Sequence, residues 1–121
     1  MEIQSLTKAE EQVMQYLWKI KKGFLKDLLD VFQEPKPHTN TISTILKMLK
    51  EKGFVDYRVF GRQHEYYPLI SKEQYSNKSM KKLVKNYFSG SYKNAVSFLV
   101  EKNELSIDDL ELLLNELKNK G

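Results

Sequence analysis

Short polar side chains are concentrated in the segment His38 to Phe54, which reads HTNTISTILKMLKEKGF. Exposed helix surfaces normally carry Glu, Lys, Gln and Ala, because short hydroxylated and β-branched residues are poor helix formers. Hydroxyl and amide groups can hydrogen-bond both base edges and phosphate oxygens, and short side chains allow close approach of the helix backbone. We therefore predict a DNA recognition helix at about residues 38–52. Its candidate contacts are Thr39, Asn40, Thr41, Ser43, Thr44 and Lys47. The alternative is a capping cluster on an ordinary surface helix.

The same segment carries apolar residues at the spacing of one helical face. These residues are Ile42, Ile45, Leu46 and Leu49. A stripe at i, i+3, i+4 and i+7 predicts an amphipathic helix whose apolar side is buried. Gly53 is expected to end this helix in the left-handed conformation. Pro35 and Pro37 precede the helix and predict a turn, because neither can continue a helix from the segment before it.

A β-hairpin is predicted directly after this helix. Residues 54–60 and 64–69 are rich in aromatic and β-branched side chains, and they flank Gly61-Arg62-Gln63. The hairpin forms a basic wing at about residues 58–64, where phosphate or a minor groove could be contacted. Its candidate contacts are Arg58, Arg62, Gln63 and His64. A tip that is basic only for solubility is the alternative.

Two further helices are predicted before the recognition helix. Thr7 and Glu10 have the capping-box spacing that starts a helix, and Gly23 is expected to end it. The second helix runs from about Phe24 to Phe32. Residues 1–70 thus form a winged helix-turn-helix, so the expected fold class is mostly α with a small β-hairpin.

Residues 71–121 are predicted to form a helical dimerisation region. Ser71 and Ser106 are expected to cap helices reaching about Phe88 and Leu117, with a short apolar helix from about Tyr92 to Lys102 between them. Three such helices are too small to fold alone and too apolar to stay uncovered. We expect a homodimer, with a tail folded back on its own winged helix as the alternative. The candidate dimerisation residues are Leu83, Tyr87, Phe98, Leu99, Leu110, Leu113, Leu114 and Leu117.

Charge is distributed unevenly along the 121 residues, whose net charge is +4. Residues 71–93 hold six basic and one acidic residue, whereas residues 94–121 hold three basic and six acidic residues. This pattern fits a body that binds a polyanion and an acidic tail kept away from it, although a gradient without a partner is the alternative.

Several classes of protein are disfavoured by composition. The sequence has no cysteine and only two histidines, His38 and His64, on different predicted elements, so we expect no metal and no cofactor. No nucleophile, phosphate loop or acid–base pair has usable spacing, so we expect no enzyme and no catalytic residue. No apolar run is long enough to insert into a membrane and no signal segment begins the chain, which predicts a cytoplasmic location.

Four stretches together resemble the penicillinase and methicillin-resistance repressor family, which also includes copper-transport repressors. They are LTKAEEQVMQYLW, NTISTILKMLKEKGFV, HEYYPLI and GSYKNAVSFLVEKNELSIDDLELL, and they span nearly the whole chain. The resemblance implies a homodimeric winged-helix transcriptional repressor that binds a palindromic double-stranded DNA operator over resistance-gene promoters. A winged helix that binds another protein without specific DNA binding is the alternative function.

The resemblance also implies roles for particular residues. Asn40, Thr41, Ser43, Thr44 and Lys47 match the recognition face and Arg62 matches the wing. Family members carry Lys or Arg, which read guanine best, at some positions where this chain has Asn40, Ser43 and Met48, so the resemblance does not give the operator sequence.

Resistance repressors of this family are inactivated by cleavage before a Phe, which a membrane sensor-protease system triggers. Ser97-Phe98 is the nearest equivalent here, although the family usually has Asn before that Phe. The copper-sensing branch carries a cysteine motif in its C-terminal region. Because this chain lacks cysteine, copper sensing is disfavoured.

Overall fold

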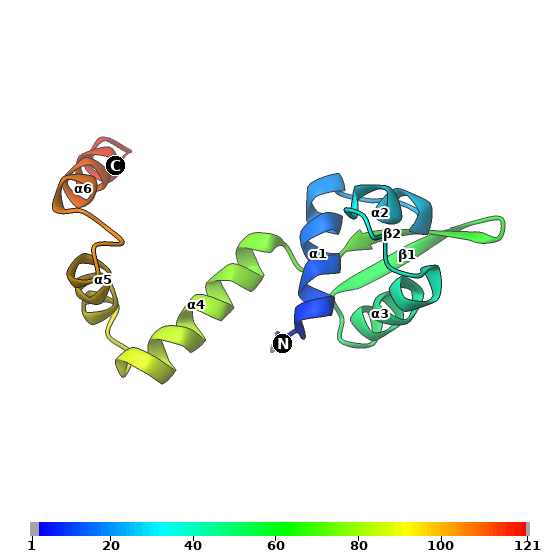
Figure 1. Ribbon diagram of the computed structural model, residues 1–121, viewed down its shortest axis with the longest axis horizontal. Coiled ribbons are helices and arrows are strands. Elements are labelled where there is room, and N and C mark those ends of the chain that lie inside the picture. Colours follow the sequence, from blue (N-terminus) through cyan, green and yellow to red (C-terminus); the bar gives the residue numbers. More distant parts are fainter. Residues whose placement is uncertain (1–2, 121) are drawn as a thin grey trace. The chain divides into compact units, whose positions relative to one another are not determined.

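The computed structural model describes residues 3–120, which form two compact units (Figure 1). The first is Met1–Lys78 and the second is Ser79–Gly121. The first unit contains α1 (Lys8–Ile20), α2 (Leu25–Val31), α3 (Thr39–Glu51), β1 (Val55–Phe60) and β2 (Gln63–Pro68). Helix α4 (Lys72–Phe88) begins in the first unit and continues into the second, which also contains α5 (Tyr92–Glu101) and α6 (Ile107–Lys120). The predicted fold class, mostly α with a β-hairpin, is confirmed.

The core of the first unit is formed by α1, α2, α3 and the start of β1. Its buried members are Val13, Met14, Leu17, Leu28, Phe32, Ile42, Leu46, Leu49, Phe54 and Val55. They include three of the four residues predicted for the buried side of α3, and the fourth, Ile45, packs against the cluster from a half-buried position. Because this side is buried, the polar side of α3 must face outward.

The helix-turn-helix is fixed by bonds at the helix ends. Lys36, in the turn between α2 and α3, donates through Nζ to the backbone oxygens of Leu29 and Phe32 at 2.9 and 2.8 Å. It thereby caps backbone carbonyls at the end of α2, including that of Leu29, which also accepts the Phe32 backbone N–H at 3.2 Å. At the start of α3, Nδ1 of His38 accepts a hydrogen bond from the backbone N–H of Asn40 at 3.2 Å.

The hairpin is an antiparallel pair in which Phe60 opposes Gln63, so Gly61 and Arg62 alone form the turn. Gly61 has φ +63°, which glycine adopts without strain. The outer edge of β2 is paired at one point: Gly23 and Tyr66 exchange two backbone hydrogen bonds of 3.0 and 2.8 Å. The hairpin is thus attached at its base, while its tip extends beyond the helices (Figure 1).

The structure corrects two boundaries. Helix α1 ends at Ile20 with Lys21 as its cap at φ +75°, so the prediction that Gly23 ends the helix was wrong. Gln63 belongs to β2 and not to the turn. The first compact unit extends to Lys78, because the first turns of α4 pack on the winged helix. The Tyr75 hydroxyl accepts a bond from the Leu6 amide at 3.2 Å.

The second unit leaves most of its apolar side chains exposed. Val84 is the only core residue among its described positions, and Phe88 and Phe98 make an edge-to-face contact at 5.5 Å. Seven predicted dimerisation residues are 41–78% exposed, and Leu110 is intermediate. The exposed ones are Leu83, Tyr87, Phe98, Leu99, Leu113, Leu114 and Leu117. Across residues 3–120, no helix is both long enough and apolar enough to cross a membrane.

A partly buried ion pair joins α1 to the end of α3. Lys52 donates through Nζ to Oε1 of Glu10 at 2.6 Å, and the same oxygen accepts a bond from the Thr7 amide at 2.9 Å. Burial raises the pKa of the Glu10 carboxyl, but the hydrogen bonds from Lys52 and Thr7 and the charge of Lys52 outweigh it. The pKa of Glu10 therefore lies below its ordinary value of 4.5.

We predict that Lys52→Met lowers the free energy of unfolding by about 2–3 kcal/mol at pH 7, because it leaves a buried carboxylate without its cation. Urea unfolding at equilibrium measures this. The control is Lys50→Met, which removes an exposed contact of 3.5 Å to Asp56 and should cost less than about 1 kcal/mol. Equal losses in the two variants would show that the Glu10–Lys52 pair does not stabilise the fold.

The same pair predicts a pH dependence. A carboxyl whose pKa is lowered by folding contributes stability above its unfolded pKa, and this contribution is lost as pH falls through the folded pKa. The gap in unfolding free energy between the wild-type protein and Lys52→Met should therefore narrow as pH is lowered from 7 to below 4.5. If the difference in unfolding free energy between the two proteins stays constant over this pH range, the pKa of Glu10 is not lowered by Lys52.

Candidate nucleic-acid interface

The polar side of α3 is open to solvent along its whole length. All six predicted contacts on this helix, at positions 39, 40, 41, 43, 44 and 47, are exposed. The Thr44 hydroxyl donates to the backbone oxygen of Asn40 at 2.9 Å, so its lone pairs and its methyl group remain for an outside partner. The side-chain amide of Asn40 and the ammonium of Lys47 can supply hydrogen-bond donors to the same partner.

Aromatic contacts order the wing next to this helix. The rings of Tyr57 and His64 stack in parallel at 3.9 Å, and Tyr66 packs edge to face on Tyr57 at 5.5 Å. Burial raises the pKa of the Tyr66 hydroxyl, with a further contribution from Tyr57, so this group stays protonated at neutral pH. Phe60 contacts Phe24, the residue before α2, edge to face at 5.8 Å.

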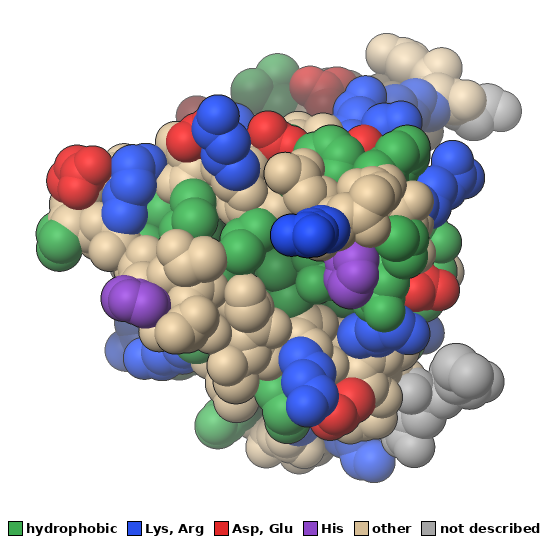
Figure 2. All heavy atoms as spheres, turned by 90° about the vertical axis from the view of Figure 1, so that its right-hand side faces the viewer, with side chains coloured by type: hydrophobic (Ala, Val, Ile, Leu, Met, Phe, Trp, Pro, Cys, Tyr) green, Lys and Arg blue, Asp and Glu red, His purple; other side chains and the backbone are tan. Residues whose placement is uncertain are grey.

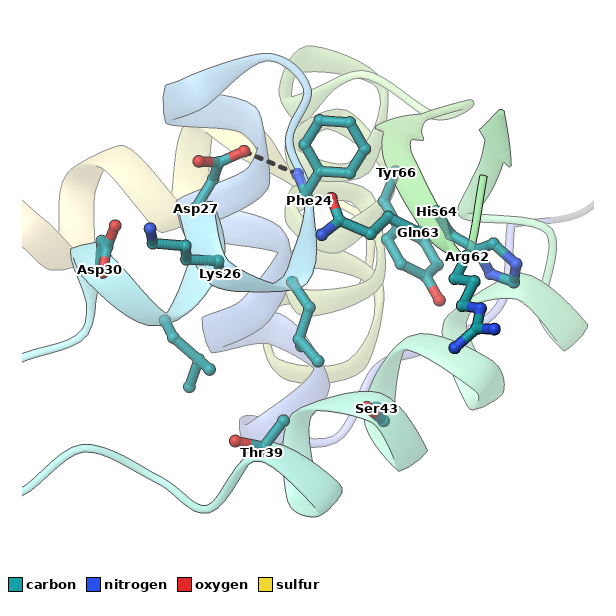
Figure 3. A pocket seen from close by; sticks show the side chains of 12 residues that line it. Phe24, Lys26, Asp27, Asp30, Thr39, Ser43, Arg62, Gln63, His64 and Tyr66 are labelled. Atoms are coloured by element: carbon teal, nitrogen blue, oxygen red, sulfur yellow. Dashed lines mark hydrogen bonds between the residues drawn. The ribbon is translucent and has the colours of Figure 1, made fainter. Parts of the chain in front are cut away.

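A cleft of about 600 Å³ lies between α2, the start of α3 and the wing (Figure 3). Thr39 and Ser43 line it from α3, and Arg62, Gln63 and His64 line it from the hairpin. Residues that are about twenty positions apart in the chain thus share one surface. The structure brings together five of the ten predicted contacts around this cleft.

An adjoining hollow of about 500 Å³ continues the surface toward the end of α3. It is lined by Lys47 and Lys50 from the helix and by Tyr57, His64 and Tyr66 from the hairpin. His64 lines both hollows and so connects the two parts of the surface. Figure 2 shows a face with a broad area of uncharged polar and backbone atoms (tan) and basic side chains (blue) around it.

Arg58 lies on the other face of the hairpin. Its guanidinium is 5.9 Å from the ring centre of Tyr67, and it lines a separate hollow with Lys21 and Lys22. Since side chains alternate along a strand, Arg58 cannot share the face of Tyr57 and His64. The structure therefore does not group Arg58 with the other wing contacts, and its contact with DNA stays a prediction.

Lys26 is a residue of this surface that sequence reasoning missed. It lies in the first turn of α2 and lines the cleft opposite the wing, near Asp27, whose carboxylate accepts a 2.8 Å bond from the Phe24 amide. The first helix of a helix-turn-helix commonly crosses the DNA backbone, which could have indicated this position. Within residues 3–120, no cluster of three or more potential metal ligands occurs.

The exposed polar helix, the preceding short helix and the attached hairpin define a winged-helix protein. A sequence model of the family described as Penicillinase repressor matches residues 6–119. The chain belongs to the penicillinase repressor family. It is a transcriptional repressor and not an enzyme, as the sequence predicted.

Individual relatives agree with this assignment. The methicillin resistance regulatory protein MecI of Staphylococcus aureus strain N315 is 29% identical over 116 residues, which cover 95% of this chain and 94% of that protein. The penicillinase repressor of Bacillus licheniformis is 25% identical over 122 residues, which cover 98% of this chain and 95% of that protein. The solution structure of the DNA binding domain of the repressor BlaI matches with a TM-score of 0.54 and 27% identity, covering 61% of this chain and 92% of that domain.

We predict that Phe60→Ala loosens the wing without unfolding the winged helix, because it removes the ring that contacts Phe24. Amide hydrogen exchange of residues 61–64, followed by NMR, should become several-fold faster, with at most about 1 kcal/mol lost from global stability. Val59→Ala, at a neighbouring position that is 63% exposed, is the control and should leave exchange at the tip unchanged. Equal exchange in both variants would show that the Phe24–Phe60 contact does not hold the wing.

Proposed function

We propose that this repressor binds double-stranded DNA, with α3 in the major groove and the wing against the neighbouring backbone. The observation that carries the proposal is the shared surface, where Thr39 and Ser43 of α3 line one cleft with Arg62, Gln63 and His64 of the wing. A recognition helix places its N-terminal residues against base edges, which suits the polar residues in the first turns of α3.

The surface offers the two kinds of contact that sequence-specific binding needs. Asn40 carries an amide suited to adenine, and the methyl groups of Thr41 and Thr44 can contact thymine. Arg62 and Lys47 can neutralise phosphate and fix the register of the helix on the duplex. Each good base contact is worth roughly 1–3 kcal/mol against a wrong base.

We predict that Thr44→Ala with Lys47→Ala abolishes specific binding and leaves the fold intact. The probe is a duplex that the wild-type protein selects from a random-sequence library, and gel shifts with competitor DNA measure affinity. We expect a loss of about a hundredfold or more, because a base contact and a phosphate contact are both removed. Gln15→Ala with Lys19→Ala, which changes two exposed residues of α1, is the matched control and should retain binding.

Two results would contradict this proposal. Equal binding by the two double variants would place the recognition surface elsewhere. Failure of the folded wild-type protein to select any sequence would favour the second candidate function, a winged helix whose polar surface binds another protein. That function would show little competition from bulk DNA.

We further propose that the repressor is a homodimer joined through its second unit. A dimer would cover the exposed apolar side chains of α4, α5 and α6, which no element within the second unit covers. Large uncovered apolar surfaces are unusual in a soluble monomer and mark association sites. A two-fold protein reads a two-fold operator, with half-sites about one or two turns of DNA apart.

We predict that Leu113→Glu dissociates the dimer. Leu113 lies on the apolar side of α6 with Leu110, Leu114 and Leu117, so a charge there would be buried in the interface. Leu112→Glu is a close control, because Leu112 is 61% exposed and helical spacing places it on the acidic side of α6. Sedimentation equilibrium should give a monomer for Leu113→Glu and a dimer for Leu112→Glu. Dimers of both variants would exclude this side of α6 from the interface.

The family resemblance supports two finer proposals. The regulated genes are resistance genes, and a membrane sensor-protease system inactivates the repressor by cleaving Ser97-Phe98. That bond lies within α5, and the Phe98 ring packs on Phe88. A protease would have to unwind α5 to reach it, and cleavage would divide the helix whose ring contact joins it to α4.

A further inference from the structure

The second half of α4 carries a stripe of lysines that the recognition surface does not include. Lys81, Lys82 and Lys85 are exposed and lie at i, i+1 and i+4, and Lys78 extends the same spacing by one turn toward the start of the helix. Between Glu73 and Glu101 the sequence contains no acidic residue. We name two of the exposed residues, Lys81 and Lys85, which lie one turn apart, the lysine face.

The lysine face is unfavourable for the helix by itself. Lysines three or four residues apart are neighbours on a helix and repel one another, whereas Glu–Lys pairs at that spacing stabilise a helix. Solvated helix surfaces in this chain do mix charges, as on α6, where Asp108, Asp109, Glu111 and Glu116 accompany Lys118 and Lys120. A single-sign surface of this kind is suited to a polyanion.

The lysine face lies opposite the apolar side of the same helix. Met80, Leu83 and Tyr87 are exposed and Val84 is buried, and helical spacing places all four on the side away from Lys81 and Lys85. Association through the apolar side therefore leaves the lysine face accessible in a dimer. The exposed Lys81 and Lys85 could then contact a ligand other than a second copy of the chain.

We propose that the lysine face binds DNA phosphates and is a second contact with the duplex, outside the winged helix. This inference rests on the proposed function. Helix α4 starts on the winged helix, where Tyr75 packs and where Nζ of Lys78 bonds Oγ of Ser5 at 3.3 Å. Lys85 follows Lys78 by seven residues, or about 10 Å along the helix. DNA held by the first unit is thus at a high effective concentration for these lysines.

The test compares two double variants of the full-length protein that change charge equally. Lys81→Gln with Lys85→Gln removes both members of the lysine face, and Lys118→Gln with Lys120→Gln removes two exposed lysines of α6. The probe is the duplex selected by the wild-type protein, titrated from 50 to 300 mM salt. Each lost phosphate contact should reduce the log–log salt slope by about 0.9, so the α4 variant should have a slope shallower by about 1.8.

The α4 variant should also bind about tenfold to a hundredfold more weakly at 0.1 M salt, with its dimer unchanged in sedimentation. The α6 variant should match the wild type. Equal log–log salt slopes for the two variants would overturn the inference. An acidic protein would then be the better candidate partner of the lysine face. Weaker binding with an unchanged slope, or with a dissociated dimer, would also overturn it by assigning these lysines a structural role.

The proposed function fails in a different way. If Thr44→Ala with Lys47→Ala binds the selected duplex as wild type does, the recognition surface is misplaced, whatever the α4 variant shows. If that variant loses binding while Lys81→Gln with Lys85→Gln behaves as the α6 control, the recognition surface is supported and only the lysine face is rejected.

Discussion

Burial of one side of α3 is the constraint on which the recognition surface depends. Ile42, Leu46 and Leu49 are almost completely buried against the rest of the core. Each contributes roughly 1.5–3 kcal/mol through removal of apolar surface from water. Turning the helix by one residue, about 100°, toward its C-terminus would replace these side chains with Ser43, Lys47 and Lys50, which have no partners in the core. Packing therefore determines which residues of α3 are presented to a duplex.

The wing depends on the same core through its base. Phe54 and Val55 are buried where β1 begins, and the paired amides of Gly23 and Tyr66 hold β2 to the segment between α1 and α2. The tip, by contrast, is attached by side-chain contacts only. This division suits a surface that must contact a duplex. The fixed base holds Tyr66 on the cleft that Ser43 also lines, while the exposed tip with Arg62 can adjust to the width of a groove.

Local patterns predicted most of the first unit. The Thr7–Glu10 capping box forms both of its hydrogen bonds, and Gly53 has φ +80° at the end of α3, because both features depend on a few adjacent residues. Gly23 was mispredicted because its conformation comes from pairing with Tyr66, forty-three positions away. Arg58 was grouped with His64 by nearness to the turn, although strand alternation separates them. Lys26 belongs to the surface only because the fold brings α2 beside the wing.

The two units satisfy the need to bury apolar surface in different ways. The first has its own core, whereas the second has Val84 as its single core residue among the positions described. A segment of this length rarely buries enough surface to be stable alone, so association would supply what the single chain lacks. In such a dimer, the second winged helix binds at the effective concentration set by the first. Any change that disrupts α5 or α6 would then release DNA without altering a residue that touches it.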